Sequence, residues 1–170
     1  ILRQVKDILR SRFSAVSPEE VEAIGEKLRN PFKQRFQSIL FVAESMRGRV
    51  KGFAMLLHEP EIGFAYLDWI ATATGRSGGG LGGALYERVR QEAAALKVKG
   101  LFFECLPDDP LLCRGEALLK QNASRLKFYE QYGARPIAGT KYETPVNPNG
   151  DCPPFLVFDG LGKTKGLPLK

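Results

Sequence analysis

The stretch that decides the fold reads Arg76-Ser77-Gly78-Gly79-Gly80-Leu81-Gly82-Gly83-Ala84-Leu85. It lies between an apolar segment with strand character, residues 62–72, and a segment with helical periodicity, residues 81–96. Glycine allows positive φ and lets a ligand approach the main chain closely. The first turn of a helix has unpaired N–H groups and a partial positive charge, which suit a phosphate. We therefore predict that residues 78–83 form a seat for a ligand with a polyphosphate group.

Two familiar phosphate-binding loops do not fit this stretch. A P-loop needs Lys followed by Ser or Thr after its last glycine, whereas Gly83 is followed by Ala84 and Leu85. A dinucleotide-binding turn follows the first strand of a βαβ unit, whereas three strand-like segments precede this loop without a crossover helix. A flexible linker is the remaining alternative, and the ordered apolar patterns on both sides argue against it.

Composition narrows the class of protein. The chain has 170 residues, 44% hydrophobic and 26% charged, which suits one globular domain. Residues 1–160 are expected to form it, and residues 161–170 a polar tail. No apolar run approaches the roughly 18 residues of a membrane span, and the charged N-terminal pattern is not a signal peptide. The net charge of +6 is spread along the chain rather than gathered with aromatic residues, so nucleic-acid binding is disfavoured.

The cysteine and histidine content argues against a metal site. The three cysteines fit no metal-ligand spacing, and the single histidine, His58, excludes a site with several histidines. An odd number of cysteines without a secretory signal indicates free thiols and a cytoplasmic protein. We expect His58 to lie at the surface and Cys105 to be a small buried hydrophobic residue.

Periodicity and capping signals predict the order of the elements. Ser17, Pro18 and Glu20 form a capping-box sequence that opens a helix ending at about Asn30. Glycine stops are expected at Gly100 and Gly133. The other predicted helices cover residues 1–13, 81–96 and 116–132, and the strands cover 38–44, 50–57, 62–72, 101–106, 135–142 and 155–158. This order predicts a mixed α/β sheet with helices on both faces.

This order, with the glycine loop after the third strand, resembles the GNAT acetyltransferase superfamily. A second motif supports the resemblance: residues 122–134 follow the family pattern N-x-x-A-x-x-x-Y-x-x-x-G-F, with Asn122 seven residues before Tyr129. The family pattern Q/R-x-x-G-x-G falls on residues 77–82, with Ser77 at the Arg or Gln position and Arg76 one place early. Ala134 replaces an aromatic residue, the link 108–121 is long, and a first family strand is missing before Ile1.

The resemblance implies a largely antiparallel twisted sheet of about six to seven strands and acetyl-CoA as cosubstrate, without a metal. It implies a pyrophosphate on the backbone of the glycine loop, the acetyl carbonyl oxygen on a backbone N–H of the third strand, and the pantetheine arm along the last helix. The residues expected to bind the cosubstrate are Ile70, Ala71, Thr72, Arg76, Ser77, Gly78, Gly79, Gly80, Leu81, Gly82, Gly83, Asn122, Arg125 and Tyr129.

Acetyl transfer to an amine needs a base, a polarised carbonyl and a proton for the leaving thiolate. The resemblance assigns the acid to Tyr129, whose alternative role is packing on an amphipathic helix. Glu104 on the fourth strand and Asp68 on the third are rival bases, and each could instead be a solvated or paired carboxylate. A water chain without a dedicated base is a third option.

The acceptor is expected to be a primary amine of a small molecule or peptide. Its pocket is expected at residues 32–36, Tyr66, Trp69 and Tyr142, although these aromatic residues are as typical of a core. An acyl-CoA sensor or docking domain without catalysis is the alternative function. A homodimer and further domains in a parent chain are left open.

Overall fold

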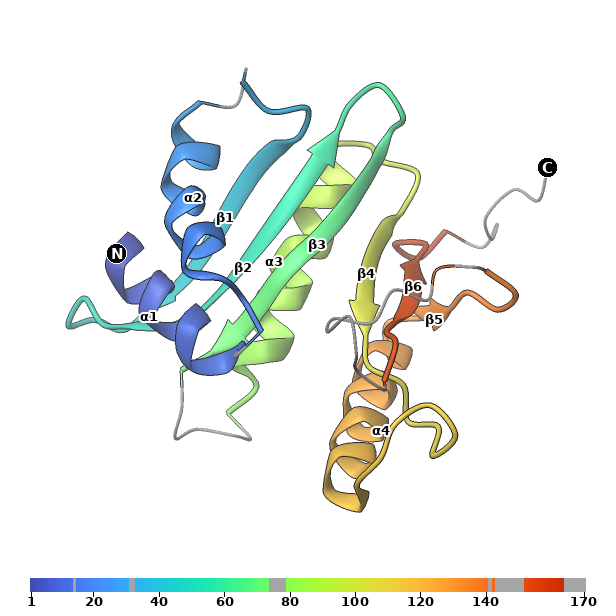
Figure 1. The fold of residues 1–170 in the computed structure, drawn as a ribbon. Helices are drawn as coiled ribbons and strands as arrows, with labels where there is room; N and C mark the ends of the chain where they lie inside the picture. The colour runs from blue at the N-terminus through green and yellow to red at the C-terminus, as the bar shows by residue number, and fades with distance from the viewer. Residues whose placement is uncertain (14, 31–32, 74–78, 141, 143–151, 164–170) are drawn as a thin grey trace. The chain divides into compact units, whose positions relative to one another are not determined.

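The computed structural model describes residues 1–13, 15–30, 33–73, 79–140, 142 and 152–163 (Figure 1). The chain divides into two compact units, residues 1–98 and 99–170. The first unit contains α1 (Leu2–Arg12), α2 (Pro18–Arg29), β1 (Gln37–Glu44), β2 (Val50–Glu59), β3 (Phe64–Thr72) and α3 (Leu81–Ala95). The second contains β4 (Leu101–Cys105), α4 (Glu116–Glu130), β5 (Arg135–Pro136) and β6 (Phe155–Asp159).

The strands of the first unit form two consecutive antiparallel hairpins. β1 pairs with β2, and β2 pairs with β3. A tight turn joins β1 to β2: Gly48 has φ +71°, and its N–H donates to the Ser45 carbonyl oxygen over 2.9 Å. Gln4 holds this hairpin from α1, because its side chain donates to the Gly48 carbonyl oxygen and accepts from the Val50 N–H.

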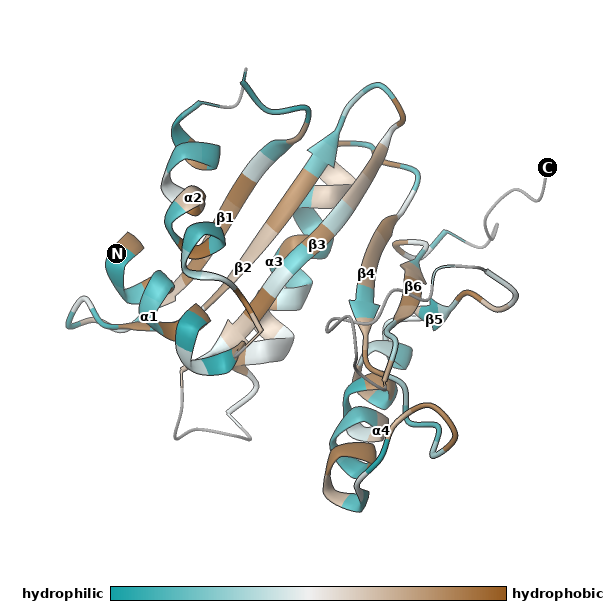
Figure 2. Ribbon diagram, viewed as in Figure 1, coloured by the Kyte–Doolittle hydropathy of each residue, from teal (hydrophilic) through white to brown (hydrophobic). Residues whose placement is uncertain are grey.

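Helices cover both faces of this three-stranded sheet. α1 and α2 pack on one face, where Phe53 and Met55 of β2 join a core of buried residues from both helices. α3 lies on the other face (Figure 1), where its Leu85 approaches Gly52 of β2. Figure 2 shows hydrophobic residues along β2, which is apolar on both sides because helices cover both.

Local sequence signals predicted the start of α2 correctly and the stop of α3 wrongly. The capping box of α2 is confirmed: the Glu20 N–H donates to Ser17 Oγ over 3.2 Å, and the Ser17 N–H donates to Glu20 Oε2 over 2.9 Å. The predicted stop of α3 at Gly100 is wrong, since the helix ends at Ala95 and Lys97 turns the chain with φ +58°. Gly100 instead allows a close approach, because an added Cβ would lie 2.1 Å from Phe158 Cε2.

In the second unit, β6 pairs antiparallel with both β4 and β5. α4 packs on β4, with the ring centroids of Phe103 and Tyr129 4.4 Å apart. The strand predicted over residues 135–142 is much shorter, since β5 covers only Arg135 and Pro136, and proline has no N–H to continue a ladder. The described residues therefore form six strands and four helices, which confirms the mixed, mostly antiparallel α/β class.

Candidate functional site

The glycine turn leads directly into α3. Gly80 is the N-cap residue and adopts a left-handed conformation with φ +69° and ψ −3°. The first backbone bond of the helix runs from the Ala84 N–H to the Gly80 carbonyl oxygen, so the preceding N–H groups have no partner within the helix. An added Cβ at Gly79, Gly80 or Gly82 would meet no atom within 4 Å. The backbone is therefore open to a ligand here, which fits a phosphate group.

The last residues of β3 are those expected to hold an acetyl carbonyl oxygen. The N–H of Ala73 donates to the Lys51 carbonyl oxygen of β2 over 2.8 Å. In an antiparallel pair, alternate residues turn their N–H groups to the same neighbour. The N–H groups of Ile70 and Thr72 consequently point away from β2. This alternation leaves Ile70 and Thr72, rather than Ala71, as candidates for the carbonyl contact.

Gly52 of β2 supports this end of β3, and sequence reasoning did not single it out. It pairs with Thr72. An added Cβ would lie 2.9 Å from the Ala71 carbonyl oxygen and 3.0 Å from Leu85 Cδ1. Glycine is therefore needed for the close approach of β2, β3 and α3 beside the candidate acetyl site.

A β-bulge lies at Asp68, in the middle of β3. Met55 pairs with Trp69 while Leu56 pairs with Leu67, so Asp68 is the extra residue of β3. Its side chain is half-buried. His58 of β2, expected at the surface, is buried instead, and its Nδ1 lies 3.4 Å from Gln37 Oε1. The structure thus gives His58 a packing position in the hairpin.

In the second unit, Tyr129 points from α4 toward β4. Only 6% of Tyr129 is exposed, and its ring packs against Phe103. Burial raises the pKa of the Tyr129 phenol above its ordinary value of 10, the nearby Cys105 thiol adds to the rise, and the Arg125 charge opposes it. Tyr129 therefore keeps its proton at neutral pH, as a general acid must before it reacts.

A cavity of about 200 Å³ lies against Tyr129 in this unit. Its lining is Asp108, Leu126, Tyr129, Glu130, Ala134, Arg135, Pro136, Phe155 and Val157. The walls are mainly apolar. The Arg135 guanidinium is held by Glu130, 3.5 Å away, and by the carbonyl oxygens of Glu130 and Ala134.

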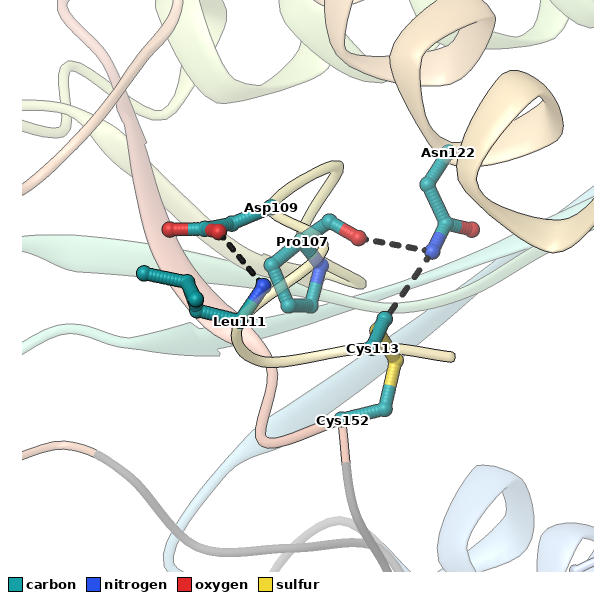
Figure 3. The surroundings of a disulfide bond; sticks show 6 residues. All are labelled: Pro107, Asp109, Leu111, Cys113, Asn122 and Cys152. Carbon is teal, nitrogen blue, oxygen red and sulfur yellow. Dashed lines mark hydrogen bonds between the residues drawn. A yellow bond between two sulfur atoms is a disulfide. The ribbon is translucent and has the colours of Figure 1, made fainter. Parts of the chain in front are cut away.

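Asn122 lies under the link between β4 and α4. It is fully buried, and its Nδ2 donates to the Pro107 carbonyl oxygen over 2.8 Å and to Cys113 Sγ over 3.8 Å (Figure 3). Its Oδ1 has no hydrogen-bond partner among the described residues. Asn122 thus ties α4 to the preceding link, and only its carbonyl oxygen has hydrogen-bonding capacity to spare.

A disulfide joins Cys113 to Cys152, so the prediction of three free thiols is wrong (Figure 3). The two Cα atoms are 4.4 Å apart, within the range of a disulfide. The pairing connects the link before α4 to the segment before β6. Cys105 is free and buried, as expected. Spacing alone held no signal for this pair, because the partners are 39 residues apart and one cysteine is left over.

Glu104 and Tyr142 meet in the second unit. The Tyr142 hydroxyl donates to Glu104 Oε1. Glu104 is exposed, on the opposite side of β4 from Phe103 and Cys105, as strand alternation predicts. A carboxylate that accepts from a phenol and faces solvent can take up a proton from an approaching amine.

The expected site residues are not all described. Arg76, Ser77, Gly78 and Phe32 lie outside the described residues. Of the aromatic residues expected around an acceptor, Phe36 is exposed. Trp69 meets Phe13 edge-to-face, with ring centroids 4.8 Å apart, and packs on the core beneath α1.

The described part of the chain has neither a metal-binding cluster nor a membrane-spanning helix. No group of three or more His, Cys, Asp or Glu side chains in it is arranged to hold a metal ion. None of its helices combines the length and apolar character needed to cross a membrane.

Comparison by sequence finds one family. The profile of the acetyltransferase (GNAT) family matches residues 2–114, which include β1 to β4 and the glycine turn. The match ends before Asn122 and Tyr129, so the second motif lies outside it. No curated protein matches the chain by sequence.

Solved structures with the same fold include several acetyltransferases. An aminoglycoside 6'-N-acetyltransferase complexed with coenzyme A is 18% identical, with a TM-score of 0.70 over 97% of this chain and 93% of that one. The ribosomal-protein-S18-alanine N-acetyltransferase from Escherichia coli is 19% identical, with a TM-score of 0.64 over 99% and 92%. A spermidine N-acetyltransferase from Vibrio cholerae, in complex with CoA and spermine, is 16% identical, with a TM-score of 0.66 over 92% and 88%.

Proposed function

The chain belongs to the GNAT family of acetyltransferases, and we propose that it transfers the acetyl group of acetyl-CoA to a primary amine. The main support for this proposal is the match to the family model, which includes the open glycine turn at the start of α3. We propose that residues 1–160 work as one domain, with residues 161–170 as a tail. The amine belongs to a small molecule or a peptide, since the acceptors named for the similar structures are of both kinds.

The pyrophosphate of CoA is proposed to bind the backbone of residues 78–83. The N-terminus of α3 supplies N–H groups and the positive end of the helix dipole. The absence of any atom within 4 Å of a Cβ at Gly79, Gly80 or Gly82 supports this placement, because a phosphate needs that space. Arg76 and Ser77 are proposed as further contacts at this loop.

The chemical step needs three groups. We propose that a backbone N–H of Ile70 or Thr72 polarises the acetyl carbonyl oxygen, and that Tyr129 protonates the leaving thiolate. Glu104 is proposed as the base for the amine because it is exposed and already accepts a hydrogen bond from Tyr142. Asp68, the extra residue in the bulge of β3, is the rival base.

CoA binding is tested by calorimetry on a variant that should still fold. Gly82→Asp adds an acidic residue in the first turn of α3, where it favours the helix dipole, yet its charge opposes a pyrophosphate. We expect loss of CoA binding with a normal thermal transition. Gly139→Asp adds the same charge at a glycine with φ +72° and open space, outside the proposed site, and should bind CoA normally. Equal CoA affinity in both variants would refute this placement.

Catalysis is tested by thiol release from acetyl-CoA with a library of primary amines. Tyr129→Phe removes the proposed acid and should lower turnover by about 10²–10⁴-fold. Tyr132→Phe removes a hydroxyl from the next turn after α4 and is the matched control. CoA binding without thiol release would favour the alternative, an acyl-CoA sensor or docking domain. The buried position of Tyr129 is the observation that favours this second candidate.

The cytoplasmic location of the protein stays a prediction. The cytoplasmic assignment relied on three free thiols, whereas the structure pairs Cys113 with Cys152. Counting the thiols of protein purified from its native source under blocking conditions distinguishes a reducing from an oxidising compartment.

A further inference from the structure

A cluster of polar groups surrounds the Tyr129 side chain in the second unit. Phe103 and Cys105 lie on one face of β4 because side chains two residues apart share a face. Tyr129 packs on Phe103, which brings its ring to that face. Arg125 lies four residues before Tyr129 on α4, so the two side chains are neighbours on one side of the helix. The cluster therefore contains a thiol, a phenol and a guanidinium.

The charge of Arg125 also affects the pKa of both acidic groups in the cluster. Burial raises the pKa of the Cys105 thiol to about 11, and the Arg125 charge works against that rise while Asp108 adds to it. The same guanidinium opposes the effect of burial on the pKa of Tyr129. Arg125 is half-buried.

The other charged groups near Tyr129 cannot replace this guanidinium. Asp108 and Glu130 line the adjoining cavity and are negative. Arg135 also lines the cavity, but it pairs with Glu130 and donates to two main-chain carbonyl oxygens. Arg125 is therefore the cation best placed to act on the Tyr129 hydroxyl.

Arg125 departs from the family pattern of this helix. In the pattern N-x-x-A-x-x-x-Y, alanine stands three residues after asparagine, and Arg125 occupies that place here. Alanine has no charge to offer a tyrosine one turn later. Tyr129 in this protein is also more than nine-tenths buried, where a phenolate without a counter-charge would be costly.

We propose that Arg125 is a positioning residue that acts through Tyr129, by stabilising the phenolate that forms when the Tyr129 hydroxyl gives up its proton. This proposal rests on the proposed function. The amine nitrogen bonds to the acetyl carbon, the C–S bond breaks, and sulfur takes the bonding electron pair and the phenol proton. The amine loses one proton to the base, which releases it to solvent, and the phenolate regains one from solvent, so protons balance over the cycle.

The expected effect of removing this charge is a loss of turnover. An opposite charge within about 4–6 Å typically shifts a pKa by about 1–3 units. If about half of that change reaches the transition state, kcat falls about 3- to 30-fold. The KM for acetyl-CoA should stay unchanged, because the phenolate develops only as the thiolate leaves. A role of Arg125 in binding CoA would instead raise KM.

The test compares Arg125→Gln, Arg125→Lys and Lys127→Gln in the thiol-release assay, with the best amine of the library. Arg125→Lys keeps the charge and should restore most of kcat. Lys127→Gln removes one positive charge from the exposed side of α4 and serves as the control. Arg125→Gln is then repeated in a Tyr129→Phe background. Because Arg125 acts through the hydroxyl, its removal should cost nothing further there.

Each outcome decides the proposal. The expected result is a lower kcat for Arg125→Gln only, rescue by Arg125→Lys, and no added loss in the Tyr129→Phe background. An equal loss in both backgrounds, or a change in KM alone, would overturn the role of Arg125 while leaving Tyr129 as the acid. Full activity of Tyr129→Phe, or no thiol release with any amine, would overturn the proposed mechanism and the role of Arg125 with it.

Discussion

Reduction of the Cys113–Cys152 disulfide should destabilise the protein strongly. The bond closes a loop of 39 residues. Closing a loop of this length lowers the conformational entropy of the unfolded chain, which stabilises the folded state by about 4 kcal/mol at 25 °C. Stabilities of whole domains are about 5–15 kcal/mol, so this loss is a large share of the total. Its effect should be greatest in the second unit, where the bond joins the link before α4 to the segment before β6.

Urea denaturation with and without dithiothreitol measures this effect. The oxidised protein should unfold at a clearly higher urea concentration than the reduced one. The double variant Cys113→Ser, Cys152→Ser should resemble the reduced protein and show no response to dithiothreitol. Cys105→Ala is the matched control, because Cys105 is not paired and its variant should keep the full response.

Thiol titration of the denatured, unreduced protein gives the direct check. One free thiol, that of Cys105, is expected. Three free thiols, together with identical urea curves in the two conditions, would refute the pairing and restore the prediction made from the cysteine count.

Three further substitutions test a close backbone contact, a helix cap and an ion pair. Gly52→Ala should destabilise by about 1–3 kcal/mol in chemical denaturation, because its Cβ would press on the Ala71 carbonyl oxygen 2.9 Å away; an unchanged midpoint would contradict this close approach. Ser17→Ala should cost about 1 kcal/mol by removing the cap of α2, while Ser17→Asn, which keeps a capping oxygen, should cost little. The hydrogen bond from Lys6 lowers the pKa of Glu22 below its ordinary value of 4.5, so this pair stabilises the fold above that pH and less as acid protonates Glu22. Glu22→Gln should flatten the plot of unfolding free energy against pH between about pH 5 and 3, where a glutamate titrates. An unaltered plot would show that the pair contributes nothing to stability.

Local features of the sequence were sufficient for the elements that local forces determine. The capping box at Ser17 involves atoms three residues apart, and its two hydrogen bonds are as predicted. The glycine turn before α3 depends on backbone freedom at Gly80, which the residue type alone predicts. Alternation along β4 likewise predicted that Glu104 faces away from Phe103. Family membership followed from the order of these elements and the motif.

Only the tertiary structure decided the features that depend on distant partners. Gly100 was interpreted as a helix stop. Its role is to leave room for the ring of Phe158, which lies 58 residues later in the sequence. His58 is buried and lies opposite Gln37 in the β1–β2 ladder, and its own neighbours in sequence reveal neither feature.

The same distinction separates what was known of the site from what was not. The sequence by itself determined the family, the glycine turn and the identity of Tyr129 as a candidate acid. The burial of Tyr129, the approach of Arg125 and Cys105 to it, and the pairing of Cys113 with Cys152 required the fold. The physical reason is that pKa, burial and covalent pairing depend on distances between side chains from different elements, whereas caps and turns depend on neighbours along one chain.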